Sequence, residues 1–205
     1  MRPETGNNRP TSDRKVSIQQ PLDGHSFSIP EAPAASAGDG RVEVELLFAR
    51  TMLVPEALHD EQRAAAWFAM NGMSLAPDEI VVATEARSGC VALIALPRTL
   101  VAQLREKWGD GIRFTTPLLH VPADTAKCVW ALRAGGLTYV KIFDGPEMRF
   151  AEVLPSADDT DLLYLFERLG GSFALRDYVL RLSGADAKAM RRLIGKRFKR
   201  VICES

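Results

Sequence analysis

The sequence predicts an α/β protein made of two similar units, each with a mixed β-sheet whose faces are covered by helices. Three observations lead to this prediction. First, strand-like and helix-like patterns alternate in a clear order through the C-terminal part of the chain. Second, residues 137–155 predict a β-hairpin, because Asp144-Gly145 separates two runs rich in β-branched and aromatic residues. Third, a weaker copy of this hairpin surrounds Asp23-Gly24 near the N-terminus.

The first unit is predicted over residues 15–120. It follows a polar stretch at 1–14 that lacks periodicity and is expected to be disordered. Alternating apolar and polar residues indicate its strands, while Pro at the start and Gly at the end mark its helices. The predicted elements are a hairpin at 16–30, strands at 41–48, 79–84, 90–96 and 112–115, and helices at 55–72 and 97–109.

The second unit is predicted over residues 121–205. Leu162, Leu165, Phe166 and Leu169 recur at helical spacing, and Asp residues crowd the start of this helix, where negative charge is favourable. The predicted elements are a strand at 127–133, the hairpin at 137–155, a helix at 158–171, a strand at 178–182, a helix at 185–195 and a strand at 198–203.

The two units share an order of elements. The second reads β-β-β-α-β-α-β, and the first reads the same with one extra strand. A shift of 121 residues superposes Asp23-Gly24 on Asp144-Gly145 and Val16 on Leu137. Because this order is that of a ribonuclease-H-like unit, the sequence predicts an internal duplication of that unit with mixed sheets.

Composition narrows the classes of function. The 205 residues are 46% hydrophobic and carry a formal net charge of zero, so overall charge favours neither nucleic acid nor a membrane surface as partner. No apolar run reaches the roughly 20 residues that span a bilayer, and the polar N-terminus does not look like a secretion signal. We expect a cytoplasmic protein without membrane insertion.

The three cysteines are expected to be buried apolar side chains, and the three histidines are expected to lie on loops or the surface. The spacing of these residues predicts no metal site.

Several runs spread over residues 15–205 resemble DUF3822, a family of uncharacterised bacterial proteins. These runs are RTMLVPEAL, NGM, TPLL, LTYVKIFDG, RFAEVLP, LYLFERLG, YVLRLSG and GKRFKRVICE. Members of that family are similar to actin-like ATPases in a compact version. The resemblance therefore implies an actin-like fold of two ribonuclease-H-like units, and it supplies no reaction because the family has no assigned activity.

The resemblance also implies where a nucleotide would lie, since actin-like proteins hold phosphates with two hairpin turns and a helix start around an inter-half cleft. The residues carried over are Asp23, Gly24, Asp144, Gly145, Ser183 and Gly184. The second turn departs from the pattern, because Pro146 removes a backbone donor and Glu147 adds negative charge. We therefore expect degenerate phosphate turns, no catalytic residues and no bound cofactor. ATP with Mg²⁺ remains the alternative ligand, and residual ATPase activity is not expected.

A basic C-terminal segment is the other candidate site. Its cations, which would contact nucleic-acid phosphates, are Arg191, Arg192, Lys196, Arg197, Lys199 and Arg200. The same residues also suit a solvated helix face and a helix C-terminus, where positive charge is favourable. A ribonuclease-like metal site is disfavoured, because the first strand of each unit lacks an acidic residue.

These observations favour a non-catalytic actin-like protein that acts as a scaffold or assembly factor through an unidentified protein partner. An ATP-binding switch that uses the inter-half cleft is the first alternative. A nucleic-acid-associated protein that uses the basic C-terminal segment is the second.

Overall fold

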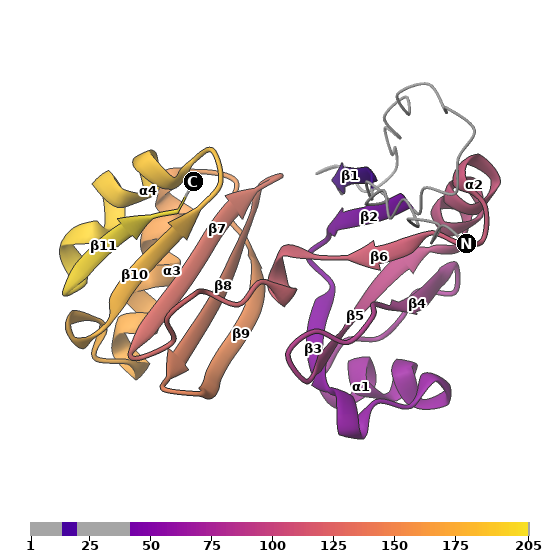
Figure 1. The fold of residues 1–205 in the computed structure, drawn as a ribbon, viewed down its shortest axis with the longest axis horizontal. Helices are drawn as coiled ribbons and strands as arrows, with labels where there is room; N and C mark the ends of the chain where they lie inside the picture. The colour runs from indigo at the N-terminus through magenta and orange to yellow at the C-terminus, as the bar shows by residue number, and fades with distance from the viewer. Residues whose placement is uncertain (1–13, 20–41, 205) are drawn as a thin grey trace, which may run out of the picture.

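The computed structural model describes residues 14–19 and 42–204, and within them it has a mixed α/β architecture in two halves (Figure 1). The strands of the first half are β1 Arg14–Gln19, β2 Val42–Leu47, β3 Thr51–Pro55, β4 Glu79–Ala83, β5 Cys90–Pro97 and β6 Arg113–Thr115. Its helices are α1 Ala64–Met70 and α2 Arg98–Trp108, with the 3₁₀ turns η1 Glu56–Leu58, η2 Glu61–Arg63 and η3 Pro117–Leu119.

The second half has the predicted order β-β-β-α-β-α-β. Its strands are β7 Cys128–Ala134, β8 Leu137–Asp144, β9 Glu147–Pro155, β10 Val179–Ser183 and β11 Arg200–Cys203. Its helices are α3 Asp159–Ser172 and α4 Ala187–Ile194, with the 3₁₀ turns η4 Leu175–Asp177 and η5 Gly195–Arg197. Asp158 caps α3 by accepting hydrogen bonds from the backbone N–H groups of Thr160 and Asp161.

The five strands of the second half form one sheet in the order β11-β10-β7-β8-β9. Strands β7, β8 and β9 are antiparallel neighbours, whereas β7, β10 and β11 are parallel. Helices α3 and α4 cover one face and enclose a core that includes Val140, Phe166 and Met190. This is the mixed sheet expected of a ribonuclease-H-like unit.

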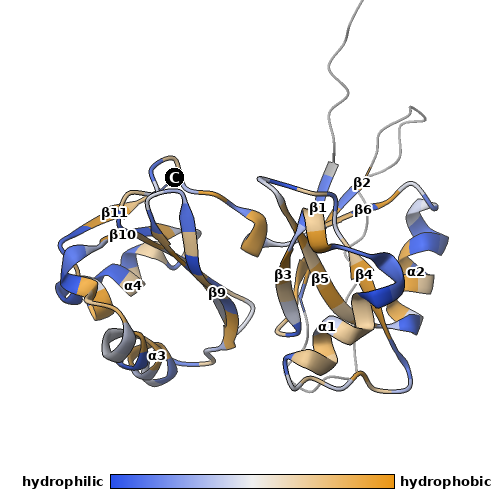
Figure 2. Cartoon of the chain, turned by 90° about the horizontal axis from the view of Figure 1, so that it is seen from below, coloured by the Kyte–Doolittle hydropathy of each residue, from blue (hydrophilic) through white to orange (hydrophobic). Residues whose placement is uncertain are grey.

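The first half contains two smaller sheets, β1-β2-β6 and β3-β5-β4. All neighbours in the first sheet are parallel, and all neighbours in the second are antiparallel. Side chains from both sheets and from α2 share a core that includes Ile18, Leu46, Ile94 and Leu104. Figure 2 shows that strands β3, β4 and β5 are predominantly hydrophobic, whereas α2 carries both hydrophobic and hydrophilic residues.

Two details of the first half differ from the sequence prediction. The expected helix at 55–72 is shorter, because β3 occupies residues up to Pro55 and two 3₁₀ turns precede α1. Strand β3 was not predicted, since it is short and begins only four residues after β2, beyond a bend at Ala49 and Arg50.

The 121-residue shift is wrong as an alignment of strands. It places β1 on β8, yet β1 pairs in parallel with β2, while β8 is antiparallel to both of its neighbours. The three parallel strands β1-β2-β6 instead match β7-β10-β11 in order, with α2 and α4 each preceding the last strand. Strand β7 is therefore the topological counterpart of β1. The predicted hairpin at Asp23-Gly24 lies outside the described residues.

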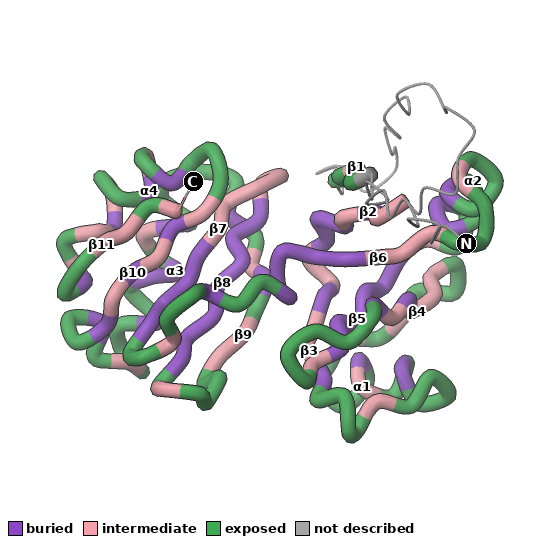
Figure 3. Tube along the Cα trace, viewed as in Figure 1, coloured by how far each residue is buried: buried purple, intermediate pink, exposed green. Residues whose placement is uncertain are grey.

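The two halves are joined by an apolar interface. The five-stranded sheet has a second apolar face along β7, β8 and β9, whose side chains cluster with residues of the first half. Figure 3 shows the long buried stretches of β7 and β8. There Trp130 and Tyr139 pack with Leu47 of β2 and with Leu118 of η3. Leu118 belongs to the connection, which is the segment 116–127 that links β6 to β7 and includes η3. Trp130 is 1% exposed, as expected of a core aromatic residue. Each buried apolar side chain of this size contributes about 1.5–3 kcal/mol, so separating the halves is costly.

Candidate functional site

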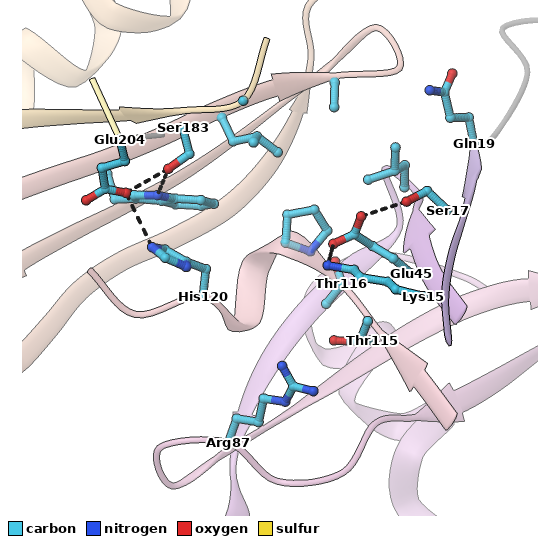
Figure 4. Close-up of a pocket in the computed structure, with 16 residues that line it drawn as sticks. Lys15, Ser17, Gln19, Glu45, Arg87, Thr115, Thr116, His120, Ser183 and Glu204 are labelled. Atoms are coloured by element: carbon cyan, nitrogen blue, oxygen red, sulfur yellow. Dashed lines mark hydrogen bonds and ion pairs between the residues drawn. The ribbon is translucent and has the colours of Figure 1, made fainter. Parts of the chain in front are cut away.

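A cleft of about 560 Å³ lies between the halves. Strands β1 and β2 form one wall, and the other wall lies where β7 and β10 reach their carboxyl ends (Figure 4). Ligands of open α/β sheets bind outside the carboxyl ends of parallel strands, so the topology itself marks this cleft as the candidate site. Ser183 and Gly184, which follow β10, line it as the resemblance implied.

The second-half wall holds a chain of hydrogen bonds. Trp130 Nε1 donates to Ser183 Oγ at 2.8 Å, and Ser183 Oγ donates to Glu204 Oε2 at 2.8 Å. Arg181 Nη1 also donates to Glu204 Oε1 at 3.3 Å, and His120 Nε2 lies 3.5 Å from Glu204 Oε2. The only carboxylate that lines this wall among the described residues is thus held by three side chains of the same half and the connection.

His120 is placed by contacts on both sides. Its ring centroid lies 4.9 Å from that of Trp130, and its edge meets Glu204. Partial burial lowers the pKa of His120 below its ordinary value of 6.5, although the Glu204 carboxylate opposes that effect. At neutral pH the imidazole is therefore mainly neutral and can donate to or accept from a ligand in the cleft.

The first-half wall is also internally paired. Glu45 on β2 forms an ion pair with Lys15 Nζ at 2.7 Å and accepts a hydrogen bond from Ser17 Oγ at 2.9 Å. Arg87, which reaches the cleft from the β4–β5 connection, pairs with Glu43 at 2.8 Å. Thr116 is buried at the floor, and its hydroxyl has no hydrogen-bond partner among the described residues.

Asp144 and Gly145 do not share this cleft. They form the β8–β9 turn, at the opposite end of β8 from Leu137, and Asp144 Oδ2 lies 3.6 Å from Lys127 Nζ at the start of β7. The turn that follows β7 into the cleft region is Gly135-Gly136. The sequence prediction reached this turn by aligning β1 with β8, and the structure places the turn outside the cleft. Asp23 and Gly24, the other predicted pair, lie outside the described residues.

The Gly135 turn contacts the first half directly. Gly135 has φ +61°, and a Cβ built there would lie 3.3 Å from the side chain of Gln19 at the end of β1. The positive φ favours glycine at this position, and a Cβ would in addition crowd the side chain of Gln19 across the two halves. Neither β1, which ends at Gln19, nor β7, which ends at Ala134, places a carboxylate at its terminus.

Sequence reasoning missed most of the cleft. Lys15, Glu45, His120, Trp130 and Glu204 come from five separate segments, and no local motif connects them. The only usable signal was positional, because residues that follow parallel strands gather at one edge of a sheet. No group of three His, Cys, Asp or Glu residues in the described part of the chain is arranged to hold a metal ion.

The basic segment lies on α4, η5 and the start of β11, which is an edge strand of the five-stranded sheet (Figure 1). Arg197 is engaged by Glu167 of α3. The other five predicted cations are exposed, and none of the six lines the cleft.

The burial of the cysteines differs from one to the next. Cys128 is buried as expected, whereas Cys203 is exposed, which corrects the prediction for that residue.

The fold is that of the actin-like ATPases. A protein of unknown function with an actin-like ATPase fold from Bacteroides thetaiotaomicron VPI-5482 has a similar solved structure, with a TM-score of 0.67 and 15% identity. The match covers 95% of this chain and 91% of that chain.

Weaker similarity extends to two further structures. The cytoplasmic domain of EpsL, an inner membrane component of the type II secretion system of Vibrio cholerae, has a TM-score of 0.41 and 12% identity over 71% of this chain and 62% of that chain. The PilM–PilN type IV pilus biogenesis complex has a TM-score of 0.42 and 15% identity over 80% and 70%, respectively. No protein-family model and no curated protein matches the sequence, so the resemblance to DUF3822 is not confirmed. No helix of the described residues is long and apolar enough to cross a membrane.

Proposed function

We propose that this chain is a non-catalytic actin-like protein that serves as a scaffold or assembly factor for another protein. The observation that carries the proposal is the state of the cleft carboxylates. Glu45 is paired with Lys15, and Glu204 is held by Ser183 and Arg181, so neither is free to bind a metal through water as an ATPase requires. The cleft lies where an active site would be expected, but its acidic side chains are engaged in contacts within the protein.

The apolar interface between the halves supports the same proposal. A nucleotide switch works by moving two halves about a hinge, and such motion is cheap only where few apolar contacts are broken. Here Tyr139 and Leu118 are fully buried and Trp130 nearly so at the junction, so opening would expose them. A rigid body of this kind suits a scaffold that presents a fixed surface.

Calorimetric titration with Mg-ATP tests the proposal. We expect no saturable heat up to about 1 mM ATP, a concentration that corresponds to only about 4 kcal/mol of binding free energy. Small-angle scattering profiles with and without Mg-ATP are expected to coincide. A dissociation constant in the micromolar range, or a nucleotide-dependent change in the radius of gyration, contradicts it. Purified candidate partners are then tested for a stoichiometric complex by size-exclusion chromatography with light scattering.

An ATP-binding switch is the second candidate, and the size and position of the cleft favour it. Lys15 supplies a cation in the cleft, and Ser183 and Gly184 line the cleft at the end of β10, shortly before α4 begins. Under this alternative, Mg-ATP raises the melting temperature of the wild type, Lys15→Gln reduces the rise, and Asp144→Ala leaves it unchanged because Asp144 lies elsewhere. Absence of any rise in the wild type removes this candidate.

A nucleic-acid-associated role is the third candidate, favoured by the exposure of five of the six predicted cations. Fluorescence anisotropy with single-stranded RNA and duplex DNA tests it. Reversal of Arg191, Arg192 and Lys196 to Glu should weaken binding and flatten its salt dependence. Reversal of Arg105 and Lys107 on α2 is the matched control, since it removes the same kind of charge from another helix.

A further inference from the structure

A second pocket, which shares Arg87 with the cleft and otherwise has different lining residues, lies between the β4–β5 turn of the first half and the β8–β9 turn of the second. Its volume is about 310 Å³, which falls within the range of small-molecule sites. Cys90 and Ser88 contribute from one side, Phe143 and Pro146 from the other, and Leu119 from the connection. The Lys141 side chain lines it from β8.

Lys141 stands at a position where the pattern of β8 calls for an apolar residue. Leu137, Tyr139, Lys141 and Phe143 alternate onto the face that turns toward the first half, and all four are buried. Lys141 is 2% exposed. An ammonium group is costly to bury unless a counter-charge or several hydrogen bonds compensate. A lysine at this position therefore needs an explanation beyond packing.

The protein compensates this charge only in part. Lys141 Nζ donates one hydrogen bond, to the backbone oxygen of His120 at 2.6 Å, and lies 5.7 Å from the centroid of the Phe143 ring. An ammonium has three donors. Among the described residues no carboxylate forms an ion pair with Lys141. Two donors thus remain for a ligand in the pocket.

The rest of the lining fits an anion with an apolar body. Among the described residues that line the pocket none is acidic, and Arg87 adds a second cation at its edge. Arg87 is itself paired with Glu43, so Lys141 is the principal free cation. Leu119, Val121 and Met148 give the pocket apolar walls.

The turn that borders the pocket is strained. Ser88 has φ +52° and Gly89 φ +75°, which define a tight turn in which Asn or Gly is the usual first residue. A serine pays a conformational cost at this angle, and such outliers concentrate at ligand sites. Ser88, which lines the pocket, therefore holds a conformation that glycine would adopt without this cost.

We propose that this pocket binds a small organic monocarboxylate, with the carboxylate on Lys141 and the apolar chain against Leu119, Val121 and Phe143. The inference concerns a different site from the cleft, so it stands whether or not the scaffold proposal holds.

Isothermal titration of the full chain with octanoate and with 1-octanol tests the proposal, because the two probes share a chain length and differ in charge. We expect the wild type to prefer octanoate at least about tenfold, which corresponds to 1.4 kcal/mol. Lys141→Met should reverse the preference. Lys127→Met, which removes an exposed lysine at the start of β7, is the matched control and should preserve it. Equal affinities in the wild type, an unchanged preference in Lys141→Met, or no octanoate binding at about 10 mM would overturn the proposal.

A second pair of variants covers the case in which Lys141→Met does not fold. Val121 is 41% exposed at the edge of the pocket, so its substitution leaves the core intact. Val121→Glu should weaken octanoate binding at least about tenfold through like-charge repulsion, whereas Val121→Lys should not. Equal affinities of these two variants for octanoate contradict an anion site.

Discussion

Ser183 Oγ lies 2.8 Å from Trp130 Nε1 and accepts its hydrogen bond across the parallel pair β7–β10. The same hydroxyl donates to Glu204, so the turn residue carried over as a phosphate contact is engaged on both sides. A buried indole N–H needs a partner, and Trp130 is 1% exposed. The hydroxyl of Ser183 therefore has a structural role that is independent of any ligand.

Ser183→Ala should lower the free energy of unfolding by about 1–3 kcal/mol, because it leaves the Trp130 N–H unsatisfied and removes one bond from Glu204. Urea denaturation measures this loss. Ser156→Ala is the control, since the Ser156 hydroxyl is buried without a hydrogen-bond partner in the described structure and its removal should be neutral or stabilising. Equal losses for the two variants would show that the Trp130–Ser183 bond contributes nothing.

Lys141 gives stability a specific dependence on pH. Burial lowers the pKa of Lys141 from 10.5 to about 8. Between these values the unfolded chain binds more protons than the folded chain, so stability rises with pH across this window and is least below pH 8. Across the whole window, deprotonation of Lys141 raises the free energy of unfolding by about 3 kcal/mol. Cys128 lowers the free energy of unfolding as the pH rises above 9, because burial raises the pKa of that thiol to about 11.

Comparison of the wild type with Lys141→Met isolates this effect. Urea unfolding at pH 7, 8 and 9 should show that the variant is more stable at pH 7 by about 1–3 kcal/mol and that its advantage shrinks as pH rises. The advantage should also shrink on addition of octanoate to the wild type. A constant difference between the two proteins from pH 7 to 9 would mean that Lys141 has an ordinary pKa.

Local patterns predicted most of the second half. Strand β8 and helix α3 were predicted almost residue by residue, because strand alternation, helical spacing with an acidic first turn, and an Asp-Gly turn all agree there. Strand β3 was missed because its five residues carry little periodicity. The parallel pairing of β1 with β2 was missed for a different reason: strand partners are chosen by long-range packing that no local signal reports.

The cleft was predictable only in outline. The resemblance to actin-like proteins implied Ser183 and Gly184 as cleft residues, and the structure puts both in the cleft. Lys15, Glu45 and Glu204 could not be recognised, since each is an ordinary charged residue at a strand edge until the halves come together. In the second pocket, Lys141 carried a sequence signal of its own, because a lysine in the middle of an apolar strand face breaks the pattern on which the strand was predicted.

Ser88 provides a prediction about the turn beside the second pocket. Ser88→Asn should raise the free energy of unfolding by about 1 kcal/mol, because Asn tolerates a positive φ better than Ser does. In a chain of this size the expected gain in melting temperature is about 2–4 °C. Differential scanning calorimetry measures it, and Ser172→Asn at the end of α3 is a control without a positive φ. A decrease in melting temperature would contradict the strain assigned to Ser88.

Gly184 separates a structural role for the Ser183-Gly184 turn from a phosphate-binding role. It has φ +83°, and a Cβ there would lie 2.8 Å from Cδ1 of Leu132. Gly184→Ala should therefore cost about 1–2 kcal/mol of stability from the backbone alone. Gly171→Ala is the control, since that glycine lies in α3 with open space around it and its replacement should stabilise the helix.

If the Ser183-Gly184 turn also binds phosphate, Gly184→Ala will abolish any Mg-ATP-induced thermal shift that Gly171→Ala retains. If the turn serves the fold alone, as the internal pairing of Ser183 indicates, neither variant will show such a shift and only Gly184→Ala will lose stability.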